Sequence, residues 1–547
     1  MINKTLDGLK LELEKIIKEL GVNEDIDIFF EVPKDSSFGD YSVNVAMRLA
    51  KVLKKAPIMI ANDIVSKIDL KKNNLSKVEV AGAGFINFFM DQSHLNDVII
   101  QINKEGSHYG DNNFGEGKKI NLEYVSANPT GFLHVGHGRG AAYGDSMARI
   151  YKKCGFDVTR EYYVNDGGNQ INNLANSIYE RYKELFGLDC NLLDDYYHGP
   201  EIIVVAKEIK ALHGDKYLHE EWFDYFREYG VNFLLANLKE VLKEFGVEFD
   251  IWFSERSLYS SGAVDSAIKK LEDEGHTYTK DGAIWLKTQE RGDEKDRVIV
   301  KSDKSLTYLM PDIAYHANKL SRGYDTIIDV LGADHHGYID RLKASIYYMG
   351  YDPEKLIVEI LQMVRVLKDG EEVKMSKRSG KAITLKDLMD EAGSDALRYM
   401  YSSKALSSHM DLDLDLMVSE TNENPVYYVQ YAYARICSLF RNLSANGTCF
   451  IEASEISHID NEAIKDLVSL LLQYPSVVID AASKRLPHKI ASYAYGLAGA
   501  FHSFYNNNKI ISDDLEKTYE LLTVSKAVGI VLKDALNLIG VGVKEKM

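Results

Sequence analysis

The spacing of hydrophobic residues changes along the chain and marks off a first region at residues 1–112. Helical spacing from Leu6 to Leu20, and again from Ser42 to Lys54, alternates with extended runs rich in β-branched and aromatic residues. This mixture predicts a small α/β module. The extended runs cover residues 26–32, 77–81 and 84–89.

A second region, residues 113–364, has the pattern of a parallel sheet. A hydrophobic run from Lys119 to Val125 precedes helical spacing from about Gly136 to Lys153, and another strand-like run follows at 158–164. This strand–helix–strand order is typical of a βαβ unit. Runs at 326–331 and 356–361 predict further strands, and the mainly helical, acidic stretch at about 170–290 predicts an insertion that splits the sheet.

The last part of the chain is helical in pattern. Residues 365–415 form a basic loop and connecting region, and 416–547 show helical spacing with few Gly or Pro residues. A chain of 547 residues is too long for one hydrophobic core. We therefore expect an α/β fold with a separate all-α domain at the C-terminus.

Composition narrows the classes of function. The net charge of −17 repels polyanions at long range, so any nucleic-acid binding must depend on local basic patches. No stretch approaches the ~20 apolar residues of a membrane helix, and the first residues lack a signal-peptide pattern, so we expect a cytoplasmic protein without a membrane partner. The four scattered cysteines argue against a zinc site.

The first candidate site is His134-Val135-Gly136-His137, at the predicted start of a helix. Unpaired N–H groups and the positive end of the helix dipole favour phosphate there. His134 and His137 face the same side and can donate to phosphate oxygens, while Gly136 lets a nucleotide approach the backbone. Two surface histidines or a zinc site are the alternatives, but no third zinc ligand follows at a suitable spacing.

Two further motifs add to this picture. Lys374-Met375-Ser376-Lys377-Arg378 is a basic run with flexible flanks, which could close over a leaving pyrophosphate or could be a solvated loop. Gly332-Ala333-Asp334-His335-His336 follows a predicted strand, where Asp334 could accept hydrogen bonds from a ribose or could simply form a turn.

Together these motifs resemble the class I aminoacyl-tRNA synthetases, and their flanks resemble the arginyl-tRNA synthetase family from end to end. The resemblance implies a split Rossmann-type parallel-sheet catalytic domain with a helical insertion, an N-terminal α/β module and a C-terminal all-α anticodon-binding domain. The matching segments are residues 38–41, 84–88, 123–131, 162–168, 332–338, 395–398 and 424–432.

The resemblance also implies roles for individual residues. Glu123 and Asp312, with Tyr308 beside them, would hold the guanidinium of arginine, because paired carboxylates accept bidentate hydrogen bonds from that planar cation. Asn128 would bind the α-amino group, with His336 on the same side. His134, His137, Lys374 and Lys377 would be catalytic, and Gly136, Asp334, His335, Met375 and Ser376 would bind ATP, which brings Mg²⁺ but no zinc.

Contacts with tRNA are expected at both ends of the chain. In the N-terminal module, Phe85 and Asn87 are candidates for the tRNA elbow. In the helical domain, aromatic and basic residues could stack on bases and bind phosphates, although core packing explains single aromatics equally well. The candidates there are Lys484, Arg485, Tyr495 and Tyr505.

The implied function is arginine–tRNA ligation by a monomer, with tRNA needed for the first step. One alternative is a class I synthetase for lysine, cysteine or glutamate, of which the cysteine enzyme would want zinc ligands that are absent at useful spacing. Another is a tRNA-binding relative without catalysis, which the intact His134, His137, Lys374 and Lys377 oppose. A third, an adenylyltransferase that uses no tRNA, would leave the helical tail unexplained.

Overall fold

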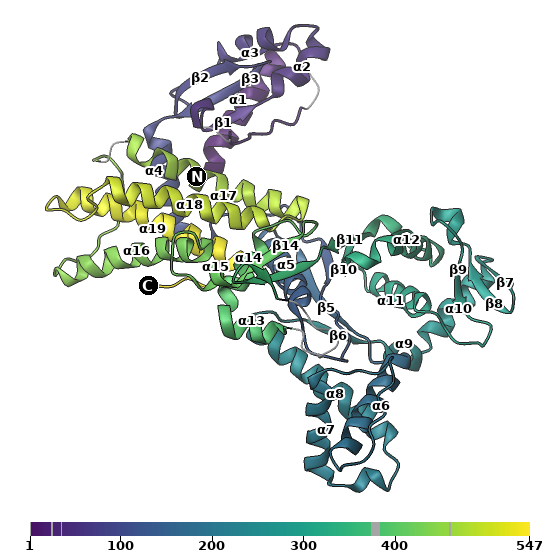
Figure 1. Ribbon diagram of the computed structural model, residues 1–547. Helices are drawn as coiled ribbons and strands as arrows, with labels where there is room; N and C mark the ends of the chain where they lie inside the picture. The colour runs from purple at the N-terminus through teal and green to yellow at the C-terminus, as the bar shows by residue number, and fades with distance from the viewer. Residues whose placement is uncertain (1, 23–25, 34–35, 374–382, 459–460) are drawn as a thin grey trace.

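The computed structural model describes residues 2–22, 26–33, 36–373, 383–458 and 461–547 (Figure 1). The side chains of residues 2–5, 7, 36, 92–95, 336 and 461–463 are not part of this description. Lys374, Met375, Ser376 and Lys377 lie outside the described residues, as does the side chain of His336.

The N-terminal module is a three-stranded antiparallel sheet with helices, and it projects from one end of the molecule (Figure 1). The predicted extended run at 26–32 makes one isolated bridge, from Glu31 to Ser42, beside a strand only three residues long. The elements are α1 (Ile2–Glu19), β1 (Tyr41–Val43), α2 (Val45–Leu53), α3 (Pro57–Val65), β2 (Leu75–Ala81) and β3 (Phe85–Met90). Next, α4 (Gln92–Glu105) packs against the C-terminal helices.

The centre of the molecule is a five-stranded parallel sheet in the order β11-β10-β4-β5-β6. Its strands are β4 (Lys119–Glu123), β5 (Asp157–Val164), β6 (Ile251–Ser254), β10 (Thr326–Gly332) and β11 (Leu356–Leu361). Helix α5 (Val135–Lys153) joins β4 to β5, which confirms the predicted βαβ unit. Because the chain leaves β4 toward β5 on one side and β10 pairs on the other, a topological switch point lies between β4 and β10, where ligands bind in such sheets.

Two insertions, rather than the single one predicted at 170–290, extend from this sheet (Figure 1). The sheet strand β6 lies between them, so the chain returns to the centre within the predicted range. The first insertion comprises α6 (Gly168–Glu184), α7 (Pro200–His213) and α8 (Phe223–Glu244). The second comprises α9 (Arg256–Ser260), α10 (Ala263–Asp273), β7 (Thr277–Lys280), β8 (Ala283–Leu286) and β9 (Arg297–Val300), followed by α11 (Leu309–Ser321).

After β10, helix α12 (Ile339–Tyr348) leads to β11, and a small sheet connects the centre to the helical domain. That domain consists of long helices, as the sequence predicts from residue 416 onward. The connecting elements are β12 (Val364–Lys368), β13 (Glu371–Glu372), α13 (Leu385–Ala392), α14 (Ser394–Ser402), β14 (Met410–Asp413) and α15 (Leu414–Val418). The long helices are α16 (Pro425–Ala445), α17 (Asn461–Lys484), α18 (His488–Asn507) and α19 (Leu515–Leu538). None of the helices in the described ranges is long and apolar enough to cross a lipid bilayer.

Arg398, on α14, ties three parts of the molecule together. Its guanidinium is buried and donates to the Asp145 carboxylate on α5 at 2.5 Å. It also donates to the carbonyl oxygens of Phe245, at the end of α8, and Ile539, at the end of α19, both at 3.1 Å. The helix that begins at the histidine motif is therefore joined directly to the helical domain.

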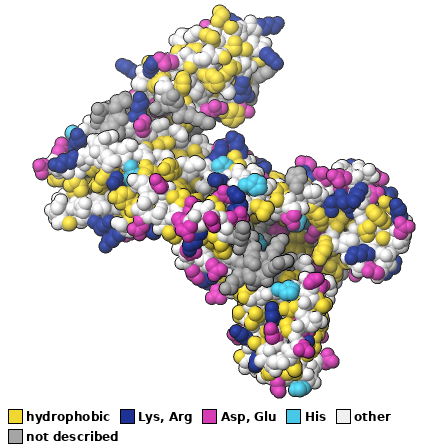
Figure 2. Space-filling view, viewed as in Figure 1, with side chains coloured by type: hydrophobic (Ala, Val, Ile, Leu, Met, Phe, Trp, Pro, Cys, Tyr) yellow, Lys and Arg dark blue, Asp and Glu magenta, His cyan; other side chains and the backbone are white. Residues whose placement is uncertain are grey.

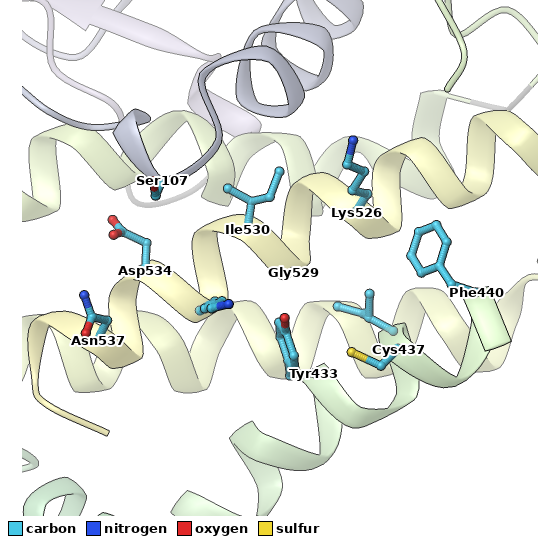
Figure 3. A pocket seen from close by; sticks show the side chains of 11 residues that line it. Ser107, Tyr433, Cys437, Phe440, Lys526, Gly529, Ile530, Asp534 and Asn537 are labelled. Carbon is cyan, nitrogen blue, oxygen red and sulfur yellow. The ribbon is translucent and has the colours of Figure 1, made fainter. Parts of the chain in front are cut away.

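A mainly apolar cavity of about 420 Å³ lies within the helical domain, between α16 and α19 and beside Ser107 (Figure 3). Two of the ionisable side chains at its edge are engaged: Lys526 pairs with Glu452, and Asp534 accepts from Tyr474 at 2.5 Å. This cavity contains none of the predicted site residues.

Candidate active site

A cleft of about 510 Å³ opens at the carboxyl ends of the strands, at the switch point. It brings together six of the predicted residues from distant parts of the chain: Glu123, Asn128, His137, Tyr308, Asp312 and His335. Residues not singled out from the sequence also line it, among them Tyr163, Glu255, Tyr315, His316, Asp329 and Tyr338.

The two histidines of the motif form the start of α5. His134 is the N-cap, and its Nδ1 accepts from the Gly136 N–H at 3.1 Å, while the Nδ1 of His137 accepts from the His134 N–H at 3.2 Å. The rings stack with centroids 3.7 Å apart. Because both Nδ1 atoms accept, each neutral ring carries its proton on Nε2, which leaves two N–H donors.

Burial keeps these imidazoles neutral. It lowers the pKa of His134, and it lowers the pKa of His137 to about 3, with a smaller contribution from His134. Gly136 has no side chain, and a Cβ there would come within 3.2 Å of the His134 ring. A neutral pair of donors at a helix N-terminus is suited to the oxygens of a phosphate.

The loop between β4 and the histidines turns sharply. Val125 and Ser126 both have positive φ, at 68° and 38°, which is an unfavourable conformation for a β-branched residue. The Ser126 hydroxyl donates to Glu123 Oε1 at 2.9 Å and accepts from the Tyr163 N–H at 3.0 Å. This strained turn fixes one oxygen of Glu123 at the edge of the cleft.

Three carboxylates lie side by side across the middle of the sheet. Glu123 on β4 is the register partner of both Glu161 on β5 and Asp329 on β10, so all three side chains point to the same face. All three are buried. Such a row needs countercharges, because unpaired buried carboxylates are costly.

Those countercharges come from α11 and the residue after it. The Lys319 ammonium contacts Glu123 and lies 2.7 Å from Asp329. The His316 ring also lies 2.7 Å from Asp329. The Arg322 guanidinium binds Glu161 through two contacts of 2.8 and 2.9 Å. The Tyr315 hydroxyl lies within 3.1 Å of Glu123 and Glu161.

This ion pairing shifts the pKa values of Lys319 and Asp329. Burial alone would lower the pKa of Lys319, but Asp329, Glu123 and Glu161 raise it overall. Burial would raise the pKa of Asp329, but Lys319 and His316 hold it well below its usual range. Lys319 and Asp329 are therefore both charged and neutralise each other.

Two further carboxylates in the cleft, those of Asp312 and Glu255, differ because they have no cation partner among the described residues. Among the described residues, neither Asp312 nor Glu255 has a Lys, Arg or His within ion-pairing distance. Asp312 accepts from the Tyr338 hydroxyl at 2.5 Å, and Glu255 from the Tyr163 hydroxyl at 2.8 Å. Burial raises the pKa of both; Glu123 raises that of Asp312 further, and Asp312 that of Glu255. The cleft thus holds two acids without a described countercharge, and a bound cation would favour their ionised forms.

The other predicted ligand residues lie at the rim. Tyr308, just before α11, is 69% exposed, and Asn128 is exposed and donates to Gln170 at 2.9 Å. Asp334 and His335 are exposed on the turn after β10 and lie 3.0 Å from each other. All four side chains are accessible to a ligand.

The predicted tRNA-contact residues are in varied surroundings. Phe85 is exposed on the N-terminal module, where Figure 2 shows hydrophobic side chains on the viewed face, but Asn87 is buried and accepts from Ser42 at 2.8 Å. Arg485 donates to Glu359 on β11 at 2.5 Å, so it joins two domains. The remaining candidates lie on the helical domain: Lys484 pairs with Asp480, Tyr495 is exposed, and Tyr505 lies under Arg435.

Comparison with known proteins identifies the family. Three family models match in order: "Arginyl tRNA synthetase N terminal domain" at residues 7–90, "tRNA synthetases class I (R), catalytic domain" at 98–413, and "DALR anticodon binding domain" at 429–547. Curated arginine–tRNA ligases from Bacillus licheniformis and Bacillus subtilis are each 48% identical, with coverage of 100% and 99% of both chains respectively. The chain belongs to the arginyl-tRNA synthetase family.

Solved structures agree with this assignment. A putative arginyl-tRNA synthetase from Campylobacter jejuni superposes with a TM-score of 0.77 at 35% identity, covering 84% of this chain and all of the other. The Thermus thermophilus arginyl-tRNA synthetase has the same fold, with a TM-score of 0.76 at 20% identity over 98% and 99% of the two chains. As a member of this family, the chain is an ATP-dependent aminoacyl-tRNA ligase with an anticodon-binding domain. In the described residues, no cluster of His, Cys, Asp and Glu could hold a metal ion.

Sequence reasoning missed Glu255 and the cations of α11 in this synthetase. Glu255 follows β6, which the hydrophobic pattern assigned to an insertion, so nothing placed this acid at a strand end. A signal for α11 was present: Asp312, Tyr315, His316 and Lys319 have i, i+3, i+4, i+7 spacing and form one helical stripe.

Proposed function

We propose that the cleft is where this arginine–tRNA ligase activates L-arginine with ATP. The guanidinium would lie between Asp312 and Glu255, with Glu123 and Tyr308 beside it. The observation that carries this proposal is the pair of buried carboxylates that lack a described countercharge. A guanidinium supplies the missing charge, and its fork of N–H donors suits acids on different elements.

In the first step, the carboxylate of arginine attacks the α-phosphorus of ATP, and pyrophosphate leaves to give arginyl-adenylate. The Nε2–H groups of His134 and His137 would donate to phosphate oxygens on which charge develops, and they are already oriented by their Nδ1 hydrogen bonds. Gly136, Asp334 and His335 would lie against the nucleotide, and Asn128 against the α-amino group, with His336 on that side. Mg²⁺ would accompany the phosphates, and Lys374 and Lys377, with Met375 and Ser376 between them, would contact the leaving pyrophosphate.

In the second step, the arginyl group passes to the 2′-hydroxyl of the terminal adenosine of tRNA. The helical domain would hold the anticodon side through Lys484, Tyr495 and Tyr505, and Phe85 would face the tRNA elbow. Positioning supplies most of the catalysis, because the nucleophile is the substrate's own carboxylate. We propose that the enzyme acts as a monomer in the cytoplasm.

The test is to charge total tRNA with each of the twenty amino acids in turn, using wild type and Asp312→Asn. We expect charging with arginine alone and a loss of roughly 100-fold or more in kcat/KM for the variant, by analogy with unpairing a buried charge. Charging with lysine at a comparable rate, or an unimpaired variant, would refute the proposed site.

A further inference from the structure

The ammonium of Lys319 lies directly behind the floor of the cleft. The side chain is fully buried and does not line the cleft, but both carboxylates that it contacts, Glu123 and Asp329, do. It therefore acts on a ligand only through these two acids.

The surroundings of Lys319 define its electrostatic role. The charged and titratable groups that face it are Glu123 on β4, Glu161 on β5, Asp329 on β10, and Tyr315 and His316 on its own helix. Because Arg322 pairs with Glu161 and His316 with Asp329, Lys319 is the cation left for Glu123 among the described residues. Without it, Glu123 would add a third uncompensated charge to those of Asp312 and Glu255.

A hydrogen-bonded chain also connects Lys319 to Asp312. His316 donates through Nδ1 to the Asp312 carbonyl at 2.8 Å and lies through Nε2 at 2.7 Å from Asp329, which accepts from Lys319 at 2.7 Å. Lys319 then donates to Glu123. This chain of contacts runs from the Asp312 backbone to the carboxylates of Asp329 and Glu123, so it links α11 to β10 and β4 behind the cleft.

We propose that Lys319 is a positioning residue that makes the cleft selective for a forked cation over a point charge. Its own ammonium neutralises Glu123 and Asp329 from behind the cleft, so these two acids no longer attract the ammonium of a lysine substrate. The uncompensated charge is thereby confined to Asp312 and Glu255, on separate elements, which a planar guanidinium can bridge and a single ammonium cannot. This inference rests on the proposed guanidinium site.

Removal of this countercharge has a defined effect on protonation. Without the Lys319 ammonium, Glu123, Asp312 and Glu255 would repel one another in one buried site. They cannot all stay ionised near neutral pH, so one of them retains a proton. Binding of a cation must then expel that proton. The pH below which arginine binding weakens therefore moves upward when Lys319 becomes neutral.

The experiment compares full-length wild type with Lys319→Met, Lys319→Gln and Lys319→Arg. Arginine KM and kcat are measured by pyrophosphate exchange with tRNA present, together with the inhibition constant of lysine in the same assay. The dissociation constant of arginine is measured by calorimetry across pH 5.5 to 8.5. Arg297→Met is the control, because Arg297 is partly buried and pairs with the buried Asp293 outside the cleft.

For both neutral variants we expect arginine KM to rise roughly 10- to 100-fold, as for a lost charged hydrogen bond, with kcat changed by less than about threefold. Lysine should become a stronger inhibitor relative to arginine by about tenfold. The pH midpoint of arginine binding should move upward, and Lys319→Arg should restore it. Arg297→Met should lower the unfolding temperature and leave all of these quantities unchanged.

The outcomes separate this inference from the function on which it rests. If the neutral variants keep the wild-type pH profile and lysine inhibition while Asp312→Asn loses arginine, the role assigned to Lys319 is wrong and the site stands. If Asp312→Asn also binds arginine normally, the proposed site itself is wrong. If Lys319→Met does not fold, Lys319→Gln, which keeps a hydrogen-bond donor, decides the question.

Discussion

Glu123 and Asp329 lie side by side on adjacent parallel strands, and the ammonium of Lys319 bridges them. The arrangement shows how a very acidic cleft can stay folded. Cations from α11 neutralise the acids in the sheet, and the acids beyond the reach of those cations remain available for the substrate.

Glu255→Gln should impair arginine binding strongly. Loss of one of two acids that share a guanidinium should raise arginine KM about 100-fold, since a buried charge pair is broken. The same change should raise the unfolding temperature of the ligand-free enzyme at neutral pH, because it removes a buried carboxylate without a described countercharge. Steady-state exchange kinetics and thermal unfolding measure the two effects. Glu272→Gln, on the surface of α10, is the control and should do neither.

Arginine affinity should fall as pH falls. Burial raises the pKa of Asp312 and Glu255, so these acids take up protons at a higher pH than ordinary carboxylates and then lose their attraction for a cation. Because their folded pKa is raised, the same protonation favours the folded state, so ligand-free stability from these groups is greatest at low pH and is lost as pH rises through the folded pKa. Calorimetry in buffers of different ionisation enthalpy should detect proton release on arginine binding. An affinity independent of pH would show that neither acid titrates with a raised pKa.

His137 should act as a neutral donor throughout the physiological range. With a pKa of about 3, it carries no charge at neutral pH. Adenylate formation at saturating arginine and ATP should therefore not accelerate between pH 8 and pH 6, as it would if an imidazolium were required. His137→Asn should lower kcat roughly 100- to 1,000-fold, the usual cost of one transition-state donor. His219→Asn, at an exposed site between α7 and α8, should leave kcat unchanged.

Arg398→Met should destabilise the fold. Its guanidinium is buried against Asp145. Its loss leaves that carboxylate with the partly exposed Arg149 as its one ion-pair partner among the described residues, so the free energy of unfolding should fall by about 3–5 kcal/mol. Denaturant unfolding gives the value. The comparison variant Arg365→Met removes an exposed pair with Asp411, which solvent screens, and should lower the free energy of unfolding far less.

Pyrophosphate exchange without tRNA should be near background. Helix α5 carries both His137 and Asp145, and Asp145 is joined through the buried Arg398 to the end of α19, so the helical domain is connected to the catalytic helix. Exchange assays with and without tRNA decide the matter. Robust exchange by the enzyme alone would contradict the prediction.

The elements that hydrophobic spacing predicted best are the buried strands and long helices. β10 and β11 are mostly apolar runs, each broken by one acid, and α16 to α19 have few interruptions, so local pattern and tertiary burial agree. Spacing did not show how the extended run at 26–32 would pair, because pairing depends on a neighbour that sequence does not reveal.

The residues of the candidate site also fall into two groups, those that the sequence predicts and those that depend on the tertiary structure. His134, Glu123 and Asp312 stand in motifs that can be recognised in one sequence. Glu255 does not, because its position depends on β6 joining the sheet after an excursion of about 80 residues. The neighbours of Glu123 could not be predicted from the sequence either, because the register of β4 against β5 and β10 decides which acids lie beside it.

The row of acids also has a consequence for how the chain is made. During synthesis, Glu123 and Glu161 leave the ribosome well before Lys319 and Arg322. Until those cations are present, the centre of the sheet cannot be buried without burying carboxylates that have no countercharge. The catalytic core must therefore assemble late, from both of its halves at once, while the first insertion between them can already have folded on its own apolar centre.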